Sequence, residues 1–405
     1  MKIVNAISRY IIGLLFIFSG FVKAVDPIGG AIKFTDYFQA LHLSALTPIA
    51  IHLAILLATL EFLIGIHLIF NIRRELTSWM TLIFMSFFTI LTLYSAIFNP
   101  VTDCGCFGDA IKLSNWQTFF KNVLFFIPTI ILFAYRKNND TNLSEPRKWA
   151  ITSYFAITIL AVSFYGMAHL PLLDFRPFKV GNNITDGMTI PPGAEQPVFE
   201  STFILQKNGQ TEEFSLENYP FKDSSWVYVE TKTKTIKEGY QPPIHDFTLA
   251  TSGGETRTEQ ILDSPKPTFL LVSHKIDQAN YRSVNKMMEL QAQCRELGYP
   301  FFLVTSSPDQ DIQDFEIKTN AAFDVLKADD TMLKTFTRAN LGLVLLQNGT
   351  ILGKWNANFT PSVAEFKNPV GAALHFQTNS RNIAYLLVIL FLSTTFALGI
   401  FLKRK

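Results

Sequence analysis

The chain has 405 residues, of which 48% are apolar and only 17% are charged. A soluble domain carries about 25% charged residues, so this shortage indicates segments that lie in lipid, and we expect the lipid bilayer as a partner. The net charge of +2 argues against a nucleic-acid partner, and three cysteines in so long a chain exclude a stabilising disulfide framework.

Six apolar runs are long enough to cross a bilayer as helices. They cover residues 3–22, 48–70, 77–98, 117–135, 149–170 and 382–402. No small-residue cleavage site follows the first run, so we interpret it as a retained helix and not as a signal peptide. Basic residues such as Lys2, Arg74 and Lys403 concentrate at one set of ends. This asymmetry predicts a bacterial inner-membrane protein with both termini in the cytoplasm and residues 171–381 in the periplasm.

The first apolar run carries a pattern at helical spacing. Steps of four and three residues place on one helix face Arg9, Gly13, Phe16, Gly20 and Lys23. Small residues on such a face let the backbone of a neighbouring helix approach closely. We therefore expect this face to pack against another membrane helix.

Glu61 lies deep inside the second apolar run, between His52 and His67. An ionisable residue at that depth is a functional candidate, although a structural ion pair is an equally physical role. With a rise of about 1.5 Å per residue, Arg9 and Glu61 differ little enough in depth for two long side chains to meet, so we expect them to pair. Whether such a pair locks two helices or handles protons stays open.

The connection between the third and fourth runs holds Cys104 and Cys106 on either side of Gly105. A Cys-Gly-Cys triplet can close a small, strained disulfide ring, and strained disulfides exchange readily, which favours a catalytic redox pair. Two alternatives stay open, namely a tight turn with idle thiols and a metal site. The metal site ranks last because a closed zinc site needs about four ligands, and only Asp103 and Asp109 lie nearby.

The start of the fourth run favours a reactive thiol. Ser114 is a candidate N-cap for this helix, and Lys121 follows inside it. A helix N-terminus and a lysine both stabilise a thiolate, so either cysteine would be more reactive than a free one if the fold brings them close. The alternative role for Lys121 is to reach toward lipid head groups.

Three motifs of this region together resemble a known family. They are the run Arg9-x3-Gly13-x2-Phe16-x2-Ser19-Gly20-x2-Lys23-x2-Asp26-Pro27, the pair Glu61-x3-Gly65 and the turn Asp103-Cys104-Gly105-Cys106-Phe107-Gly108. Over residues 1–140 the chain resembles the DoxX-like membrane proteins, and most closely their MauE branch, named for methylamine utilisation. The resemblance implies a four-helix membrane bundle associated with disulfide formation or electron transfer. A role in methylamine metabolism would need a dehydrogenase partner.

The region between the fifth and sixth runs divides into two parts. Residues 171–241 are polar, punctuated by Pro and Gly, and contain short alternating runs, which predict a small β-rich linker module. In residues 242–362 buried strand patterns alternate with helical ones and close on a hairpin with an Asn348-Gly349 turn. This order predicts a three-layer α/β/α domain.

The second part, with its Asp246-Phe247-Thr248-Leu249 opening, resembles the thioredoxin-like proteins of the TlpA and peroxiredoxin type. It departs from them where the redox cysteines would follow the first central strand, because the loop that begins at His274 contains no cysteine. Asn340 also stands in the segment where that family has a proline. We therefore do not expect thiol catalysis from this domain.

The remaining cysteine and two histidines are further candidates for site residues. Cys294 shares an apolar helix face with Val284, Met287, Met288 and Leu297, so we expect it to be an inert core residue. His245 and His274 stay candidates, although a lone histidine is more often a surface or cap residue.

These features predict an α-helical polytopic membrane protein: a four-helix DoxX/MauE-like bundle with two further spans, an extracytoplasmic β-rich linker and a thioredoxin-like domain that binds a periplasmic protein. A partner dithiol would attack a Cys104–Cys106 disulfide, and the bundle would pass two electrons on. No haem, flavin or metal motif is visible in the sequence, and a quinone is the candidate acceptor. The alternative is a non-catalytic scaffold or assembly factor. Transport ranks third, because Glu61 is the only carboxylate deep in a span.

Overall fold

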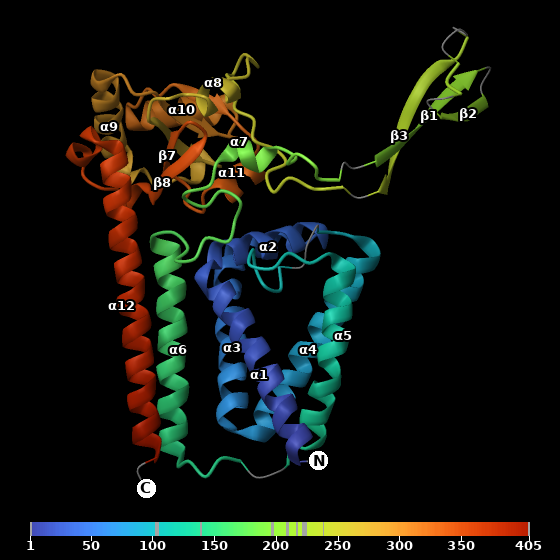
Figure 1. Ribbon diagram of the computed structural model, residues 1–405, viewed down its shortest axis with the longest axis vertical. Helices are drawn as coiled ribbons and strands as arrows, with labels where there is room; N and C mark the ends of the chain where they lie inside the picture. The colour runs from blue at the N-terminus through green and yellow to red at the C-terminus, as the bar shows by residue number, and fades with distance from the viewer. Residues whose placement is uncertain are drawn as a thin grey trace.

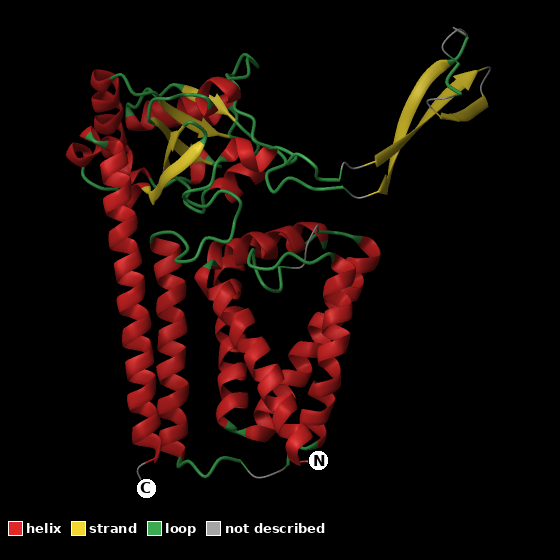
Figure 2. Ribbon diagram, viewed as in Figure 1, coloured by secondary structure: helices red, strands yellow, loops and turns green. Residues whose placement is uncertain are grey.

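The computed structural model describes residues 2–403 except 102–104, 138–139, 196–197, 208–209, 216–217, 221–224 and 238. A helical region stands below an α/β domain, and a small sheet projects from that domain to one side (Figure 1). The first helix begins, and the last helix ends, on the side away from the α/β domain (Figure 1). Strands lie only above the long helices (Figure 2).

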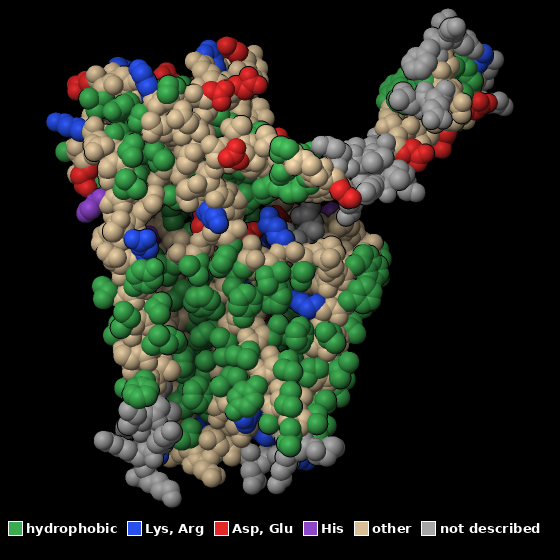
Figure 3. Space-filling model, viewed as in Figure 1, with side chains coloured by type: hydrophobic (Ala, Val, Ile, Leu, Met, Phe, Trp, Pro, Cys, Tyr) green, Lys and Arg blue, Asp and Glu red, His purple; other side chains and the backbone are tan. Residues whose placement is uncertain are grey.

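Six helices among the described residues are long and apolar enough to cross a membrane. They are the apolar parts of α1 (Lys2–Val25), α3 (Ala50–Phe70), α4 (Arg74–Phe98), α5 (Asn115–Ala134), α6 (Glu145–Ala168) and α12 (Pro369–Lys403). Each overlaps one predicted apolar run, but α12 begins well before residue 382. On the face that Figure 3 shows, hydrophobic side chains cover most of this region, whereas charged side chains gather on the α/β domain above it. The helical region therefore has the surface of a protein that lies in a bilayer.

Helices α1 and α3 touch backbone to backbone. A Cβ atom built on Gly20 would lie 2.5 Å from the Phe62 nitrogen, and one built on Gly65 would lie 2.7 Å from the Gly13 carbonyl oxygen. The predicted close approach along the glycine face of the first helix is therefore confirmed. This antiparallel register also decides which polar side chains of the two helices meet.

Helix α2 (Pro27–Ala40) is an element that the sequence patterns did not predict. Asp26 caps it by accepting the Gly29 N–H at 2.9 Å, and Pro27 occupies its first position. With 14 residues it is too short to span a bilayer. It lies across the end of the bundle, beneath the α/β domain (Figure 1).

Helices α6 and α12 run side by side next to the bundle (Figure 1). Tyr154 of α6 stacks on Phe391 of α12, with ring centroids 6.3 Å apart. Phe155 of α6 packs on Phe62 of α3. A Cβ atom on Gly166 would lie 2.6 Å from the carbonyl oxygen of Val25, so α6 also approaches α1 closely. The two additional helices are thus attached to the bundle through α6.

The α/β domain contains a five-stranded sheet of order β6-β5-β4-β7-β8. Its strands are β4 (Thr268–Ser273), β5 (Phe301–Thr305), β6 (Val325–Lys327), β7 (Gly342–Gln347) and β8 (Thr350–Asn356). β4, β5 and β6 are parallel, whereas β7 runs antiparallel to β4 and to β8. Asn348 and Gly349 both have positive φ, as the predicted two-residue hairpin turn requires.

Side chains of β4 alternate between two cores, one on each face of the sheet. Phe269 and Leu271 pack on one side with residues of α9 (Val284–Leu297), α10 (Asp309–Thr319) and the start of α12. Leu270 and Val272 pack on the other side. The helices there are α7 (Ile184–Met188), α8 (Thr258–Leu262) and α11 (Asp330–Phe336). The domain is therefore three-layered, as its alternating pattern predicted.

Residues 171–241 do not form one module. Phe178 and Ile184 of this segment are buried in the second core of the α/β domain. Only the later part forms the separate antiparallel sheet of order β2-β1-β3. Its strands are β1 (Val198–Lys207), β2 (Gln210–Ser215) and β3 (Val227–Lys237). The boundary between linker and domain therefore differs from the predicted one, because two apolar side chains near the fifth span are needed to complete the core.

Candidate functional site

The Cys-Gly-Cys loop joins α4 to α5 at the end of the bundle that carries α2. Cys104 lies outside the described residues, whereas Cys106 is described and is partly buried. Gly105 and Gly108 have positive φ angles of 66° and 52°, and the Gly108 N–H donates to the Gly105 carbonyl at 3.0 Å. Glycine adopts positive φ without steric strain, so both glycines allow the backbone of this loop to turn. The chemistry of the two thiols stays a prediction.

A buried polar network holds the backbone carbonyl of Cys106. Lys23 Nζ donates to this oxygen at 2.7 Å, and Ser19 Oγ lies 2.8 Å from it. The same Lys23 Nζ forms an ion pair with Glu61 Oε2 at 2.7 Å, which Ser19 Oγ also approaches at 2.8 Å. The side chains of Lys23 and Glu61 are only 12% and 5% exposed. One ion pair thus connects α1, α3 and the loop.

The predicted pair between Arg9 and Glu61 is wrong. Arg9 Nη2 contacts the Tyr10 hydroxyl at 3.3 Å, while Glu61 pairs with Lys23. The cause is the register of α1 and α3: Gly20 lies against Phe62, so Glu61 is level with the far end of α1. The depth estimate favoured Arg9, whereas the backbone contact of α1 with α3 places Lys23 level with Glu61.

The other polar residues named for the membrane region lie in separate places. His67 Nε2 lies 2.9 Å from Thr152 Oγ1 of α6, and His52 is exposed. Lys121 Nζ lies 4.1 Å from the centroid of the Phe107 ring, a cation–π contact that attaches α5 to the Cys-Gly-Cys loop. Ser114 caps α5 through a capping box, as predicted. The start of α5 is therefore held beside the loop.

Arg338 of the α/β domain reaches this loop from above. Its Nη2 lies 2.7 Å from Asp109 Oδ2 in the loop, and its Nε lies 2.8 Å from Asp26 Oδ2 at the cap of α2. The side chain is only 8% exposed. Burial alone would lower the pKa of the guanidinium, but Asp26 and Asp109 raise it, so Arg338 stays charged.

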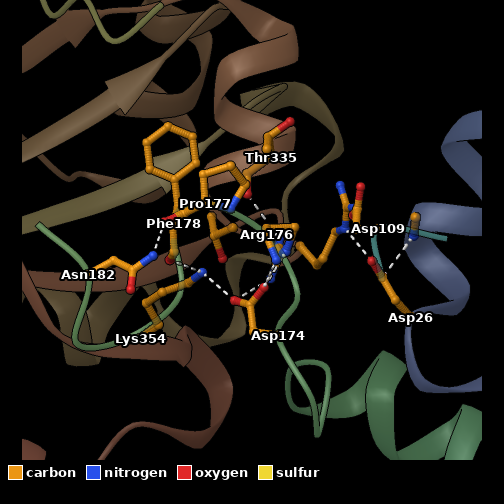
Figure 4. Close-up of polar contacts among 12 residues, drawn as sticks. Asp26, Asp109, Asp174, Arg176, Pro177, Phe178, Asn182, Thr335 and Lys354 are labelled. Carbon is orange, nitrogen blue, oxygen red and sulfur yellow. Dashed lines mark hydrogen bonds and ion pairs between the residues drawn. The ribbon is translucent and has the colours of Figure 1, made fainter. Parts of the chain in front are cut away.

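A second ion-pair cluster lies near Arg338, within the α/β domain. Asp174 accepts bonds from Arg176 at 2.7 and 2.8 Å and from Lys354 at 2.9 Å. Burial alone would raise the pKa of Asp174, but Lys354 and Arg176 hold it below its usual value. Figure 4 shows these contacts extending toward Asp26 and Asp109. The ion pairs of Arg338 therefore join the two parts of the molecule, whereas the pairs of Asp174 lie within the α/β domain.

The loop that begins at His274 is built from polar contacts. Asn340 Nδ2 donates to the Lys275 carbonyl at 2.7 Å, and its Oδ1 accepts from Ser273 Oγ at 2.8 Å. His274 is partly buried, its Nδ1 has no hydrogen-bond partner among the described residues, and burial lowers its pKa to about 4. The candidate His245 is exposed on the surface. Neither histidine lies in the network around Cys106.

Cys294 is a core residue, as predicted. It is 1% exposed, and burial raises its pKa to about 12, so the thiol stays protonated. Leu290 completes its helix face, whereas Leu297 is 44% exposed and does not belong to it. Among the described residues no group of three His, Cys, Asp or Glu side chains could hold a metal ion.

A cavity of about 410 Å³ opens beside the Cys-Gly-Cys loop. It lies between α2, α3 and α4, and Lys23, Cys106 and Arg338 are among its lining residues. Most other lining residues are apolar. The sequence patterns missed this cavity because they missed α2, which forms one of its walls. The Asp26-Pro27 pair, a typical cap and first residue of a helix, was the signal that could have revealed that wall.

Fold and surface together define a multi-pass membrane protein with an α/β domain outside the helical region. Residues 1–135 match the family model of methylamine utilisation protein MauE, and residues 199–238 match a domain of unknown function, DUF8463. No curated protein matches the chain. A matching solved structure is a secreted Mycobacterium tuberculosis disulfide oxidoreductase homologous to E. coli DsbE. That match has 18% identity, covers 32% of this chain and 95% of the other, and has a TM-score of 0.24, too low to carry an argument.

Proposed function

We propose that this protein is a thiol–disulfide electron carrier of the bacterial inner membrane, with Cys104 and Cys106 as its redox pair. The main support is the position of Cys106: its carbonyl lies 2.7 Å from Lys23 Nζ, and the residue is among those that line a largely apolar cavity. A mere turn between two helices would need neither a buried ion pair nor a cavity beside it. The match to the MauE family is compatible with this role, and a function in methylamine metabolism is not part of the proposal.

The reaction begins with a disulfide between Cys104 and Cys106. A thiolate of a periplasmic partner attacks one sulfur and forms a mixed disulfide, and the partner's second thiol then displaces the cysteine. The partner gains a disulfide, and Cys104 and Cys106 become two thiols. Two electrons and two protons then pass to an acceptor in the membrane, which restores the disulfide. The positive charge of Lys121 and the N-terminus of α5, which are held beside the loop, favour the thiolate form of the leaving cysteine.

The α/β domain has a binding role in this proposal. Its His274 loop contains no cysteine, and Arg338 attaches the same domain to the Cys-Gly-Cys loop through Asp109. The α/β domain is therefore held in a fixed position beside the redox pair. There it binds a periplasmic protein partner and brings that partner to the two cysteines.

A non-catalytic scaffold is the second candidate function. The ion pairs from Arg338 to Asp26 and Asp109 favour it, because they hold two domains together without needing any thiol. In a scaffold the Cys-Gly-Cys loop would only complete the docking surface for the α/β domain.

Trapping of mixed disulfides separates the two functions. In Cys104→Ser and Cys106→Ser variants the remaining cysteine cannot close the ring, so at least one variant should accumulate a mixed disulfide with a partner. A non-reducing gel of membranes would show it as a slower band that reductant removes. Cys294→Ala is the matched control and should behave as the wild type, because its thiol is buried. If neither serine variant traps a partner and both retain full function in cells, the scaffold is correct.

A further inference from the structure

We infer that the cavity beside Cys106 binds a quinone with an isoprenoid tail. This inference rests on the proposed thiol chemistry and names its electron acceptor. The volume of about 410 Å³ lies within the usual range of small-molecule sites. The cavity extends to Leu57 of α3 and Leu91 of α4, which belong to candidate membrane spans, and this position favours a ligand that dissolves in lipid.

The cavity has a polar side and an apolar body. The polar side consists of groups that contact one another, because Arg338 bonds Asp26 and Asp109, and Lys23 bonds the Cys106 carbonyl. The body consists of side chains of α2 and of the membrane-spanning helices α3 and α4. A quinone has the same division, with two ring carbonyls at one end and a hydrocarbon tail at the other.

Six aromatic side chains line the apolar body. They are Phe34, Tyr37, Phe38, Phe84, Phe87 and Phe88. Flat rings pack well against aromatic side chains, and such contacts stabilise a bound ring beyond the burial of its area. A saturated acyl chain would bury the same apolar surface but would use neither the aromatic contacts nor the polar side.

The cavity also has an entrance from the bilayer. Ile83 and Phe87 of α4 line it, and each is 59% exposed within the hydrophobic surface of the helical region. A ligand can therefore enter from the bilayer between α2 and α4 without passing the α/β domain. The protein substrate and the lipid-soluble acceptor thus reach the loop from different sides.

The redox step balances with this acceptor. The thiols of Cys104 and Cys106 lose two electrons and two protons and form a disulfide. The quinone takes up the same two electrons and two protons and becomes a hydroquinone, which returns to the bilayer. No further oxidant is needed.

Photolabelling of the full-length protein in nanodiscs tests the site. An azido derivative of a short-tail quinone should label α2 or α4, and excess decylubiquinone should prevent the labelling. Leu57→Trp and Leu91→Trp place a large ring in the cavity and should each weaken quinone binding about tenfold or more. Leu56→Trp is the matched control, because Leu56 is 53% exposed on the same helix as Leu57 and does not line the cavity.

Three results would overturn the inference: unchanged binding in both cavity variants, equal loss in Leu56→Trp, or equal competition by an alkyl alcohol without a quinone ring. The last result would identify a site for lipid chains only. Binding is measured in Cys106→Ser as well, because the site should not need the thiol. Normal quinone binding without formation of hydroquinone by the reduced wild type would contradict the thiol function and leave the quinone site standing.

Discussion

Glu61 accepts a hydrogen bond from Lys23 and lies next to the Ser19 hydroxyl. Lys23 and Ser19 both also contact the carbonyl of Cys106. The charge of this single residue therefore holds two helices and the loop together. Desolvation makes such a buried charge costly unless its partner is present. The network is consequently most sensitive to the removal of one partner alone.

The first prediction at this scale concerns Glu61→Gln. The change leaves Lys23 buried without a counter-charge, so the free energy of unfolding should fall by several kcal/mol. The measurement is the thermal stability of the purified protein in detergent, together with its amount in membranes. Glu75→Gln is the control, because Glu75 is an exposed acidic residue. Normal stability of Glu61→Gln together with lost activity would instead assign Glu61 to the chemistry.

The second prediction concerns His274. Burial lowers its pKa from 6.5 to about 4, so the unfolded chain binds a proton at a higher pH than the native protein does. The contribution of His274 to the free energy of unfolding is therefore present above pH 6.5 and decreases as the pH falls toward 4, by up to about 3 kcal/mol. Chemical denaturation between pH 7 and pH 4 would measure it. His274→Asn should flatten this dependence, and an equally steep profile in the variant would contradict the assignment.

At the scale of elements, α12 links the two halves of the molecule. Its first turns place Ala372 and Ala373 in the core of the α/β domain, where Phe376 packs on Trp355. The same uninterrupted helix continues into the membrane-spanning region, where Phe391 meets α6. Because a continuous helix transmits orientation, α12 fixes the α/β domain above the bundle, and Arg338 fixes it a second time at the Cys-Gly-Cys loop.

The third prediction tests this second attachment. Arg338→Ala leaves Asp26 and Asp109 without their cation, so the contact between the domain and the loop should open. Limited proteolysis of the segment 169–177 should become several times faster than in the wild type. Arg338→Lys should give only partial protection, because a lysine cannot reproduce the fork that reaches two carboxylates. Arg257→Ala, which removes an exposed pair with Glu255, is the control and should cleave as the wild type does. Equal cleavage rates in all variants would show that α12 alone holds the domain.

At the scale of the whole molecule, both chain ends lie opposite the α/β domain (Figure 1). The short connections at that same end are rich in Lys and Arg, so we expect the termini to be cytoplasmic and the α/β domain periplasmic. This arrangement would place the Cys-Gly-Cys loop on the side where disulfides persist. The redox proposal therefore depends on the orientation.

The fourth prediction tests the orientation with reporter fusions. Alkaline phosphatase should be inactive when it is fused after Lys137 and active when it is fused after Lys207, because this enzyme folds only in the periplasm. A green fluorescent protein fused at the same two positions should give the opposite pattern. Reversed activities would exclude periplasmic thiol exchange at Cys106.

Local patterns alone determined the apolar helices, the cap at Ser114, the hairpin at Asn348 and Gly349 and the buried state of Cys294. Each depends on a few neighbouring residues and on the contrast between water and an apolar environment, so a single sequence reveals it. Tertiary structure decided the rest. The choice of Lys23 over Arg9 depends on the register of two helices, the role of Arg338 joins residues that are more than two hundred positions apart, and the cavity exists only where α2 covers two other helices. None of these contacts leaves a periodic pattern in the sequence, because each depends on how separate helices and strands pack against one another.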